Sequence, residues 1–238
     1  MCILSIVKSE QGIVITSNRD EQRSRKNSLA PEIIDLGDRK AIIARDAHAQ
    51  GTWLLTDNLG RTAILLNGAF ESHIPTPPYR ESRGIILMNL FQEENFKSAF
   101  LFYNLDNIEP FQVIYLDTEH AFQCVWDGSQ KHLFAIDLST PQVFFSPTLY
   151  TKEQQEEKRN HFFKTLAAFE SIDSSQLLEI HSNQNINSLD LNFFMSREHQ
   201  TTKSISQVEL NSTQSKYVHW QSWDDQRHQH ILDYVAHA

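Results

Sequence analysis

The chain opens with the sequence MCILSIVKSEQGIVITSNRDE, residues 1–21. Two runs of apolar and β-branched residues, 3–7 and 12–17, flank a polar break at residues 8–11. This pattern is typical of a β-hairpin. The second predicted strand ends directly on Asn18-Arg19-Asp20-Glu21, and a hairpin returns these polar side chains to the first residues of the chain. We therefore predict a polar site where the two strand ends meet.

Cys2 gives this predicted site its chemistry. Removal of Met1 would leave a cysteine that carries both a thiol and a free α-amino group. The α-amine has an ordinary pKa of about 7.7–8.0 and the thiol of about 8.5, so the neutral amine can accept the thiol proton near pH 7 to 8. Asp20 could hold the N-terminus in place, and Arg19 could hold a substrate or an oxyanion. A charged strand end that only caps a loop is the alternative interpretation.

Further motifs follow in order along the chain. After Met1-Cys2-Ile3 and Asn18-Arg19-Asp20-Glu21 come Arg25, Pro31, Gly51-Thr52-Trp53-Leu54, Leu65-Leu66-Asn67-Gly68, Pro77-Pro78-Tyr79-Arg80-Glu81-Ser82-Arg83-Gly84, Glu109-Pro110-Phe111, Val125-Trp126-Asp127-Gly128 and Thr148-Leu149-Tyr150-Thr151. In these motifs the chain resembles the bacterial branch of the NRDE family, whose eukaryotic members are called transport and Golgi organization protein 2. The resemblance covers residues 1–165 and continues loosely around residues 202–206.

The NRDE family is in turn similar to the cysteine-type N-terminal nucleophile hydrolases, which include bile-salt hydrolases and penicillin V acylases. This resemblance implies an α+β fold, specifically a four-layer αββα sandwich. It also implies a single NRDE-family domain that spans residues 1–238. Those enzymes cleave unstrained amides with an N-terminal cysteine.

Site residues follow from the same resemblance. The nucleophile would be Cys2, supported by Arg19 and Asp20. Asn67 ends an apolar segment and is expected to donate a hydrogen bond to the oxyanion or the substrate, and we expect Asn18 to bind substrate. One position departs from the pattern, because this chain has Ser146-Pro147 where eukaryotic members have Ser-Asn, which removes an amide donor.

Two functions of different classes are compatible with these residues. The first is hydrolysis of a C–N amide bond, or an ester bond, in a small acylated substrate, through an acyl-enzyme formed after Met1 is removed. The second is a non-catalytic carrier or chaperone for haem or another amphipathic, lipid-like ligand, because haem handling has been associated with the family. We expect no cofactor and no metal, so haem would be the ligand of the carrier.

Composition limits the partners of the protein. A net charge of −9 and a pI near 5.6 argue against a nucleic-acid or anionic-membrane surface, so we expect a small-molecule or lipid-like ligand and no nucleic acid. No segment approaches the roughly 18 to 20 apolar residues that span a bilayer, so we expect no stable membrane insertion. The expected location is the cytoplasm, where reducing conditions keep the thiol of Cys2 free.

Secondary structure is predicted from periodicity. Strands are expected at residues 41–44, 53–56, 62–66, 111–116, 122–126, 132–136 and 142–145, and helices from Ser82 to Phe91, from Asn95 to Leu101 and from Lys152 to Phe169. Cys124 lies in a predicted strand and is expected to pack rather than react. The late histidines, His219, His228, His230 and His237, lack metal-binding spacing, and we expect a solvated C-terminal tail.

Overall fold

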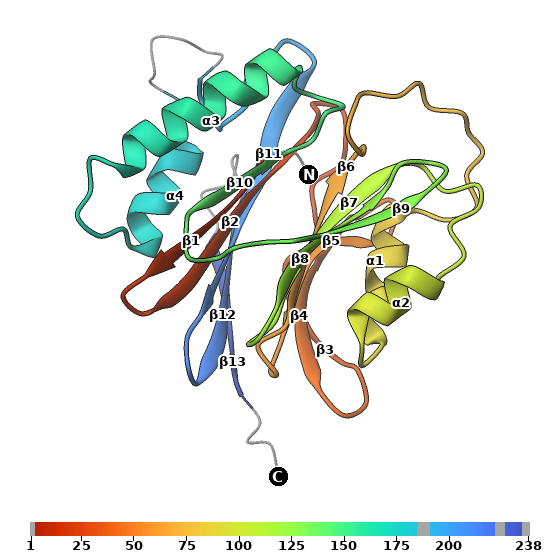
Figure 1. Cartoon of the computed structure of the whole chain (residues 1–238), viewed down its shortest axis with the longest axis horizontal. Coiled ribbons are helices and arrows are strands. Elements are labelled where there is room, and N and C mark those ends of the chain that lie inside the picture. Colours follow the sequence, from red (N-terminus) through yellow and green to blue (C-terminus); the bar gives the residue numbers. More distant parts are fainter. Residues whose placement is uncertain (1–2, 185–190, 222–226, 235–238) are drawn as a thin grey trace.

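Two antiparallel β-sheets form the centre of the molecule (Figure 1). The structure, a computed structural model, describes residues 3–184, 191–221 and 227–234. The first sheet has the strand order β10 (Gln142–Phe145), β1 (Ile3–Ser9), β2 (Gly12–Gln22), β11 (Gln200–Leu210), β12 (Gln214–Gln221) and β13 (Arg227–Asp233). The second has the order β3 (Glu32–Asp35), β4 (Lys40–Arg45), β5 (Thr52–Asp57), β6 (Thr62–Asn67), β7 (Phe111–Leu116), β8 (Ala121–Trp126) and β9 (Lys131–Ala135).

The predicted N-terminal hairpin is confirmed. Strands β1 and β2 pair from Ser9 opposite Gly12 to Ile3 opposite Asn18. Gly12 has a φ of +142°, and a Cβ there would lie 2.0 Å from the carbonyl oxygen of Leu210, so only glycine fits this turn. On its other side β2 pairs with β11, which makes the hairpin part of a continuous sheet.

Alternation along the hairpin divides its side chains between two hydrophobic cores. Leu4, Ile6 and Ile15 belong to a large cluster that also contains residues of the second sheet and of the helices that cover it. Ile3 and Val7 belong to a smaller cluster with residues of the helices at 152–166 and 174–182. Because neighbouring side chains in a strand point to opposite faces, one face of the first sheet packs towards the second sheet and the other towards helices.

In the described part of the chain, four helices flank the sheets. Helices α1 (Arg83–Gln92) and α2 (Phe96–Phe102) lie beside the second sheet, and α3 (Lys152–Leu166) and α4 (Ser174–Ser182) lie beside the first (Figure 1). Polar residues before each helix accept a hydrogen bond from its first turn, namely Ser82, Asn95, Thr151 and Asp173. Such N-caps fix where each helix begins. Among the described residues, no helix is long and apolar enough to cross a membrane.

Most predicted elements are present, but the C-terminal third differs from prediction. The strands predicted between residues 41 and 145 are observed, and Cys124 is fully buried in β8. The expected solvated tail was wrong for His228 and His230, which lie on β13, the edge strand paired with β12. An edge strand contacts solvent along one side, so its sequence stays polar and periodicity does not predict a strand there. His237 lies outside the described residues.

Candidate active site

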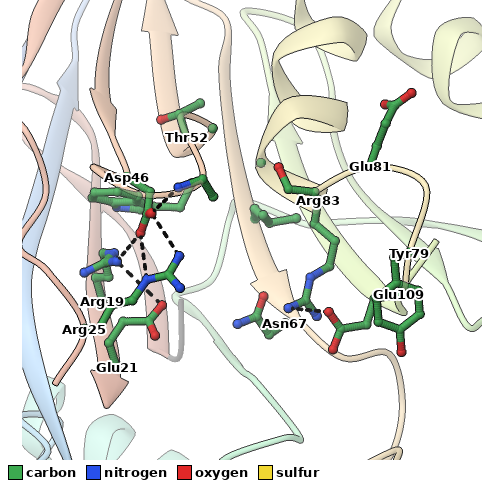
Figure 2. A pocket seen from close by; sticks show the side chains of 16 residues that line it. Arg19, Glu21, Arg25, Asp46, Thr52, Asn67, Tyr79, Glu81, Arg83 and Glu109 are labelled. Atoms are coloured by element: carbon green, nitrogen blue, oxygen red, sulfur yellow. Dashed lines mark hydrogen bonds and ion pairs between the residues drawn. The ribbon is translucent and has the colours of Figure 1, made fainter. Parts of the chain in front are cut away.

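A pocket of about 350 Å³ opens between the end of β2, strands β5 and β6, and the start of α1 (Figure 2). The described residues that line it are Arg19, Glu21, Arg25, Asp46, Ala49, Gly51, Thr52, Trp53, Leu65, Asn67, Tyr79, Glu81, Ser82, Arg83, Gly84 and Glu109. Two of the predicted site residues, Arg19 and Asn67, are therefore brought to one pocket from different sheets. They are 48 positions apart in the sequence, and only the packing of the two sheets joins them.

Arg19 is held on one wall of the pocket by a buried carboxylate. Its Nη2 lies 2.5 Å from Oδ2 of Asp46, and Arg25 donates from Nη2 to Oδ1 of the same residue at 2.9 Å. The guanidinium of Arg19 also stacks 4.9 Å from the ring centroid of Trp53. Burial by itself raises the pKa of Asp46, but hydrogen bonds from the amides of Ala49 and His48 and from Arg25, with the charge of Arg19, lower it to about 2. Asp46 is therefore a permanent anion that fixes Arg19.

One amino group of the Arg19 guanidinium, Nη1, is available to a ligand. The residue is only 2% exposed, and its Nη1 is buried and makes no hydrogen bond with any residue of the described ranges. A buried donor without an acceptor costs about 1–3 kcal/mol, so such groups are uncommon away from binding sites. Arg19 thus keeps hydrogen-bonding capacity for a group that enters the pocket.

The opposite wall carries a second ion pair. Nη2 of Arg83 lies 2.9 Å from Oε2 of Glu109, and Nε2 of His73 lies 3.1 Å from Oε1 of the same carboxylate. Figure 2 shows Asn67 beside this pair and across the pocket from Asp46. A ligand in the pocket would therefore contact charged groups on two sides.

Asn67 is anchored by Ser146, the first residue of the Ser146-Pro147 pair. Oγ of Ser146 donates to the carbonyl oxygen of Asn67 at 2.5 Å and lies 2.8 Å from the hydroxyl of Thr148. The next residue, Gly68, has a φ of +80°, and a Cβ there would lie 2.8 Å from the Thr148 side chain. Ser146-Pro147 thus holds the backbone of Asn67 from the first sheet, although it supplies no side-chain amide.

Ser146→Ala is expected to destabilise the fold. The hydroxyl is buried, and its loss leaves the carbonyl of Asn67 without this donor, which costs about 1–3 kcal/mol. Urea denaturation followed by circular dichroism measures the change. Ser139→Ala, at an exposed position outside the pocket, is the matched control and should leave stability within about 0.5 kcal/mol of wild type. An unchanged midpoint for Ser146→Ala would contradict the anchoring role.

Asp20 lies on the opposite face of β2 from Arg19. The hydroxyl of Thr202 donates to its Oδ1 at 2.5 Å, and the hydroxyl of Tyr150 donates to its Oδ2 at 3.1 Å. The residue is 2% exposed and does not line the pocket. Both carboxylate oxygens are therefore oriented by neutral hydroxyl donors.

Asn18 is fully buried beneath α4. Its Nδ2 donates to the carbonyl oxygens of His181 and Phe193, at 3.1 and 2.9 Å, and its Oδ1 lies 2.7 Å from Nδ1 of His181. The side chain thus ties β2 to α4 and does not line the pocket. Cys2 lies outside the described residues, and its neighbour Ile3 is fully buried opposite Asn18.

Sequence reasoning missed the role of several residues. Asp46 stands outside every motif quoted above, whereas Arg25, Arg83 and Glu109 lie within the motifs but were given no role. The signal that would have found Arg25, Arg83 and Glu109 is their charge within the motifs, because a charged residue in such a motif is a candidate partner for a site residue of opposite charge. No signal in the sequence points to Asp46.

Known proteins are similar to this chain in sequence and in fold. The sequence model of the family described as Transport and Golgi organisation 2 matches residues 1–226. No curated protein matches the sequence significantly. Among solved structures, a Caenorhabditis elegans ortholog of N-acylethanolamine-hydrolyzing acid amidase has a TM-score of 0.61 at 11% identity, and the match covers 87% of this chain and 92% of that one.

Two variants of the conjugated bile acid hydrolase from Clostridium perfringens are similar as well. They have TM-scores of 0.58 and 0.57, each at 10% identity. The matches cover 100% and 99% of this chain and 97% of each of those chains. At such low identity these likenesses show the fold alone, and that fold is the N-terminal nucleophile hydrolase fold.

Proposed function

The chain belongs to the Transport and Golgi organisation 2 family, and from this premise we propose that it is an N-terminal-cysteine hydrolase. Its substrate would be a small acylated molecule whose C–N amide bond, or ester bond, is cleaved through an acyl-enzyme after Met1 is removed. We further propose that the two sheets and their flanking helices form the four-layer αββα sandwich, as one domain over residues 1–238. The amidase and bile acid hydrolase neighbours support a hydrolase-like fold.

One observation carries the proposal, namely the register of the first hairpin. Leu4 and Ile6 point to the core that the two sheets share, and so does Ile15 on β2. Arg19 is four positions beyond Ile15 and therefore on the same face, where it contacts the pocket. We propose that the reaction takes place in this pocket, on the face of the first sheet that carries Arg19.

The proposed reaction begins at the N-terminus. The neutral α-amine of Cys2 takes the thiol proton, and the thiolate sulfur attacks the substrate carbonyl carbon to form a C–S bond. The C–N bond then breaks, the leaving nitrogen takes the proton from the ammonium, and a thioester remains. Water, deprotonated by the same amine, attacks the thioester and releases the carboxylic acid and the thiol. In each cycle the amine therefore takes up a proton twice, from the thiol and from water, and releases it twice, to the leaving nitrogen and to the thiolate.

Neighbouring residues have defined roles in this proposal. Nη1 of Arg19, which has no acceptor among the described residues, would bind the substrate or its oxyanion, and the side chain of Asn67 would donate from the other sheet. Asp20, which lies on the face of β2 opposite the pocket, would orient the N-terminal ammonium. Asn18 is better explained as a positioning residue, because both ends of its amide are occupied by α4 and the segment around Phe193.

Hydrolysis of N-acyl amides that release a fluorescent amine tests the proposal. A series with acyl chains of different length should reveal at least one substrate with saturable kinetics for the protein that lacks Met1. The same protein with iodoacetamide-blocked thiols should show none. Equal rates before and after blocking would contradict a thiol mechanism.

Asn67→Ala is expected to lower kcat by about 10²–10³-fold, the usual effect of removing one oxyanion donor. KM should change little, because the donor acts mainly on charge that develops in the transition state. Steady-state kinetics on the best N-acyl amide measures both constants. Asn104→Ala, at a position that does not line the pocket, is the control. A raised KM with unchanged kcat would instead assign Asn67 to ground-state binding.

The carrier hypothesis is the alternative that the pocket favours less. Its described lining includes three arginines, Arg19, Arg25 and Arg83, and four carboxylates, Glu21, Asp46, Glu81 and Glu109. Pockets for haem and lipid-like ligands are predominantly apolar. Titration with haemin, followed in the Soret band, separates the two functions, since saturable binding that survives blocking of Cys2 would support the carrier.

A further inference from the structure

A second cavity system lies beside α3 and beyond the end of β2. Two adjoining pockets, of about 390 and 380 Å³, share Gln184, Phe194 and Ser196 among their lining residues. We call them together the basic groove, defined by Arg23, Tyr150, Lys158, Phe194, Arg197 and Lys203. Four of these residues are Lys or Arg, and no Asp or Glu is among the described lining residues. A positively charged lining is unexpected on a chain whose net charge is −9.

The two arginines hold backbone carbonyls rather than carboxylates. Nη1 of Arg197 donates to the carbonyl oxygen of Leu149 at 3.0 Å, and its guanidinium lies 5.3 Å from the ring centroid of Tyr150. Nε of Arg23 donates to the carbonyl oxygen of Arg197 at 3.1 Å. Within the described ranges, no ion pair involves either arginine. Each guanidinium has five N–H donors, so both keep donors for an anion.

The two lysines add charge that is shielded from water. Lys158 is 3% exposed, and its Nζ donates to the carbonyl oxygen of Asn192 at 2.5 Å. Lys203 is 9% exposed, and its Nζ donates to the carbonyl oxygen of Arg23 at 2.9 Å. Burial lowers the pKa of Lys203, and the charges of Arg19 and Arg23 lower it further, against an opposing effect of Glu21. The charges of Arg19 and Arg23 thus make the surroundings of Lys203 more electropositive, which favours a bound anion.

We propose that the basic groove binds a small molecule that carries a phosphate or diphosphate group. Arg23 and Arg197 would hold the phosphate oxygens, because the planar guanidinium matches phosphate in two-point hydrogen bonds. The hydroxyl of Ser196 lies 3.4 Å from Nη2 of Arg23 and lines both pockets, so it can add a donor. Tyr150 and Phe194 would contact an apolar part of the ligand.

This site is separate from the candidate active site but touches it through one residue. The ring of Tyr150 lines the groove, while its hydroxyl donates to Asp20 on β2. Neither Arg19 nor Asn67 lines the groove. Binding in the groove therefore does not depend on the proposed hydrolysis, and either proposal can fail alone.

Isothermal titration of the full chain with inorganic pyrophosphate tests the groove. Saturable binding is expected for wild type, and the double variant Arg23→Gln/Arg197→Gln should weaken it by at least about tenfold, because charge-assisted hydrogen bonds are lost. The matched control is Arg45→Gln/Arg80→Gln, which removes the same charge outside the groove and should keep the affinity. Cys2→Ala should also bind pyrophosphate as wild type does, even though it would abolish the proposed hydrolysis.

Three outcomes would overturn the proposal: no saturable binding to wild type, equal weakening in both double variants, or citrate bound as tightly as pyrophosphate. The second outcome would mean that overall charge alone matters, and the third that the groove does not distinguish phosphate from carboxylate. If the double variant does not fold, as judged by its thermal transition, the single variants Arg23→Gln and Arg197→Gln carry the same test.

Discussion

A Cys2→Ala variant is expected to retain less than about one-thousandth of the wild-type hydrolysis rate. Removing the nucleophile of a covalent mechanism leaves only the contribution of binding and of the oxyanion donors, and measured losses reach about 10⁶-fold. Cys2→Ser should recover only part of the rate, because a hydroxyl is far less acidic than a thiol and is the weaker nucleophile near neutral pH. Steady-state hydrolysis of an N-acyl amide measures both variants.

Cys124 provides the internal control. It is the other cysteine of the chain, it is fully buried in β8, and burial raises the pKa of its thiol well above the ordinary value. A buried thiol of high pKa reacts slowly with alkylating reagents. Cys124→Ala should therefore keep the activity and the reactivity of wild type.

Intact mass after iodoacetamide treatment gives an independent measurement. Wild type and Cys124→Ala should each lack Met1 and gain one adduct, whereas Cys2→Ala should gain none. Retention of Met1 in the mature protein would exclude the mechanism, because the nitrogen that accepts the thiol proton would then belong to a peptide bond. Full activity of Cys2→Ala would exclude it as well.

The sequence predicts the parts of this fold in which polarity follows periodicity. In β1 and β4–β7 the apolar residues are buried, as continuous apolar and β-branched runs predict, and Ser82, Asn95 and Thr151 precede helices as N-caps should. The same reasoning does not predict strand β11, because many of its buried side chains are polar. Thr202 pairs with Asp20, and Gln207 donates to the hydroxyl of Thr16 at 2.9 Å. These hydrogen bonds replace the apolar contacts that sequence patterns detect.

The candidate active site likewise contains residues that the sequence predicts and residues that it does not. Arg19 is predictable from its position at the end of the hairpin, since local pairing brings it near the start of the chain. Asp46, which fixes Arg19, is 27 positions away in a loop of the other sheet, and only the contact between sheets creates that pair. The basic groove is likewise assembled from segments near residues 23, 150, 158 and 197 that no local pattern connects.

Stability is expected to fall steeply between pH 6.5 and pH 4.5. Burial lowers the pKa of His181 to about 3, and burial, with the charges of His228 and Arg19, lowers the pKa of His219 to about 3 as well. Both values lie below the ordinary value of 6.5, so the unfolded chain binds protons in this range that the folded chain does not. Stability is therefore constant above about pH 7 and is lost as the pH falls below 6.5.

The hydrogen bonds of His181 explain why it stays neutral. Because Nδ2 of Asn18 donates to two carbonyls, its Oδ1 faces Nδ1 of His181 as an acceptor, so Nδ1 carries the proton. Nε2 then accepts from the hydroxyl of Ser5 at 2.7 Å. His219 is similarly placed between Ser28 and Ser206, with distances of 3.1 and 2.9 Å. Protonating either ring puts a charge in a buried site where none of its hydrogen-bond partners in the described ranges is an anion.

Each buried histidine should contribute about 1.4 kcal/mol of stability per pH unit, so the pair gives a slope of about 2.7 kcal/mol. His181→Gln can keep both hydrogen bonds, with its amide N–H facing Asn18 and its carbonyl facing Ser5, and should halve the slope. Urea denaturation from pH 4.5 to 7.5 measures it, in a range where Asp46, with a pKa of about 2, stays ionised. His199→Gln, at an exposed position, should leave the slope unchanged. A slope in His181→Gln equal to that of wild type would mean that His181 binds protons equally in the folded and the unfolded chain, which would contradict a pKa lowered by folding.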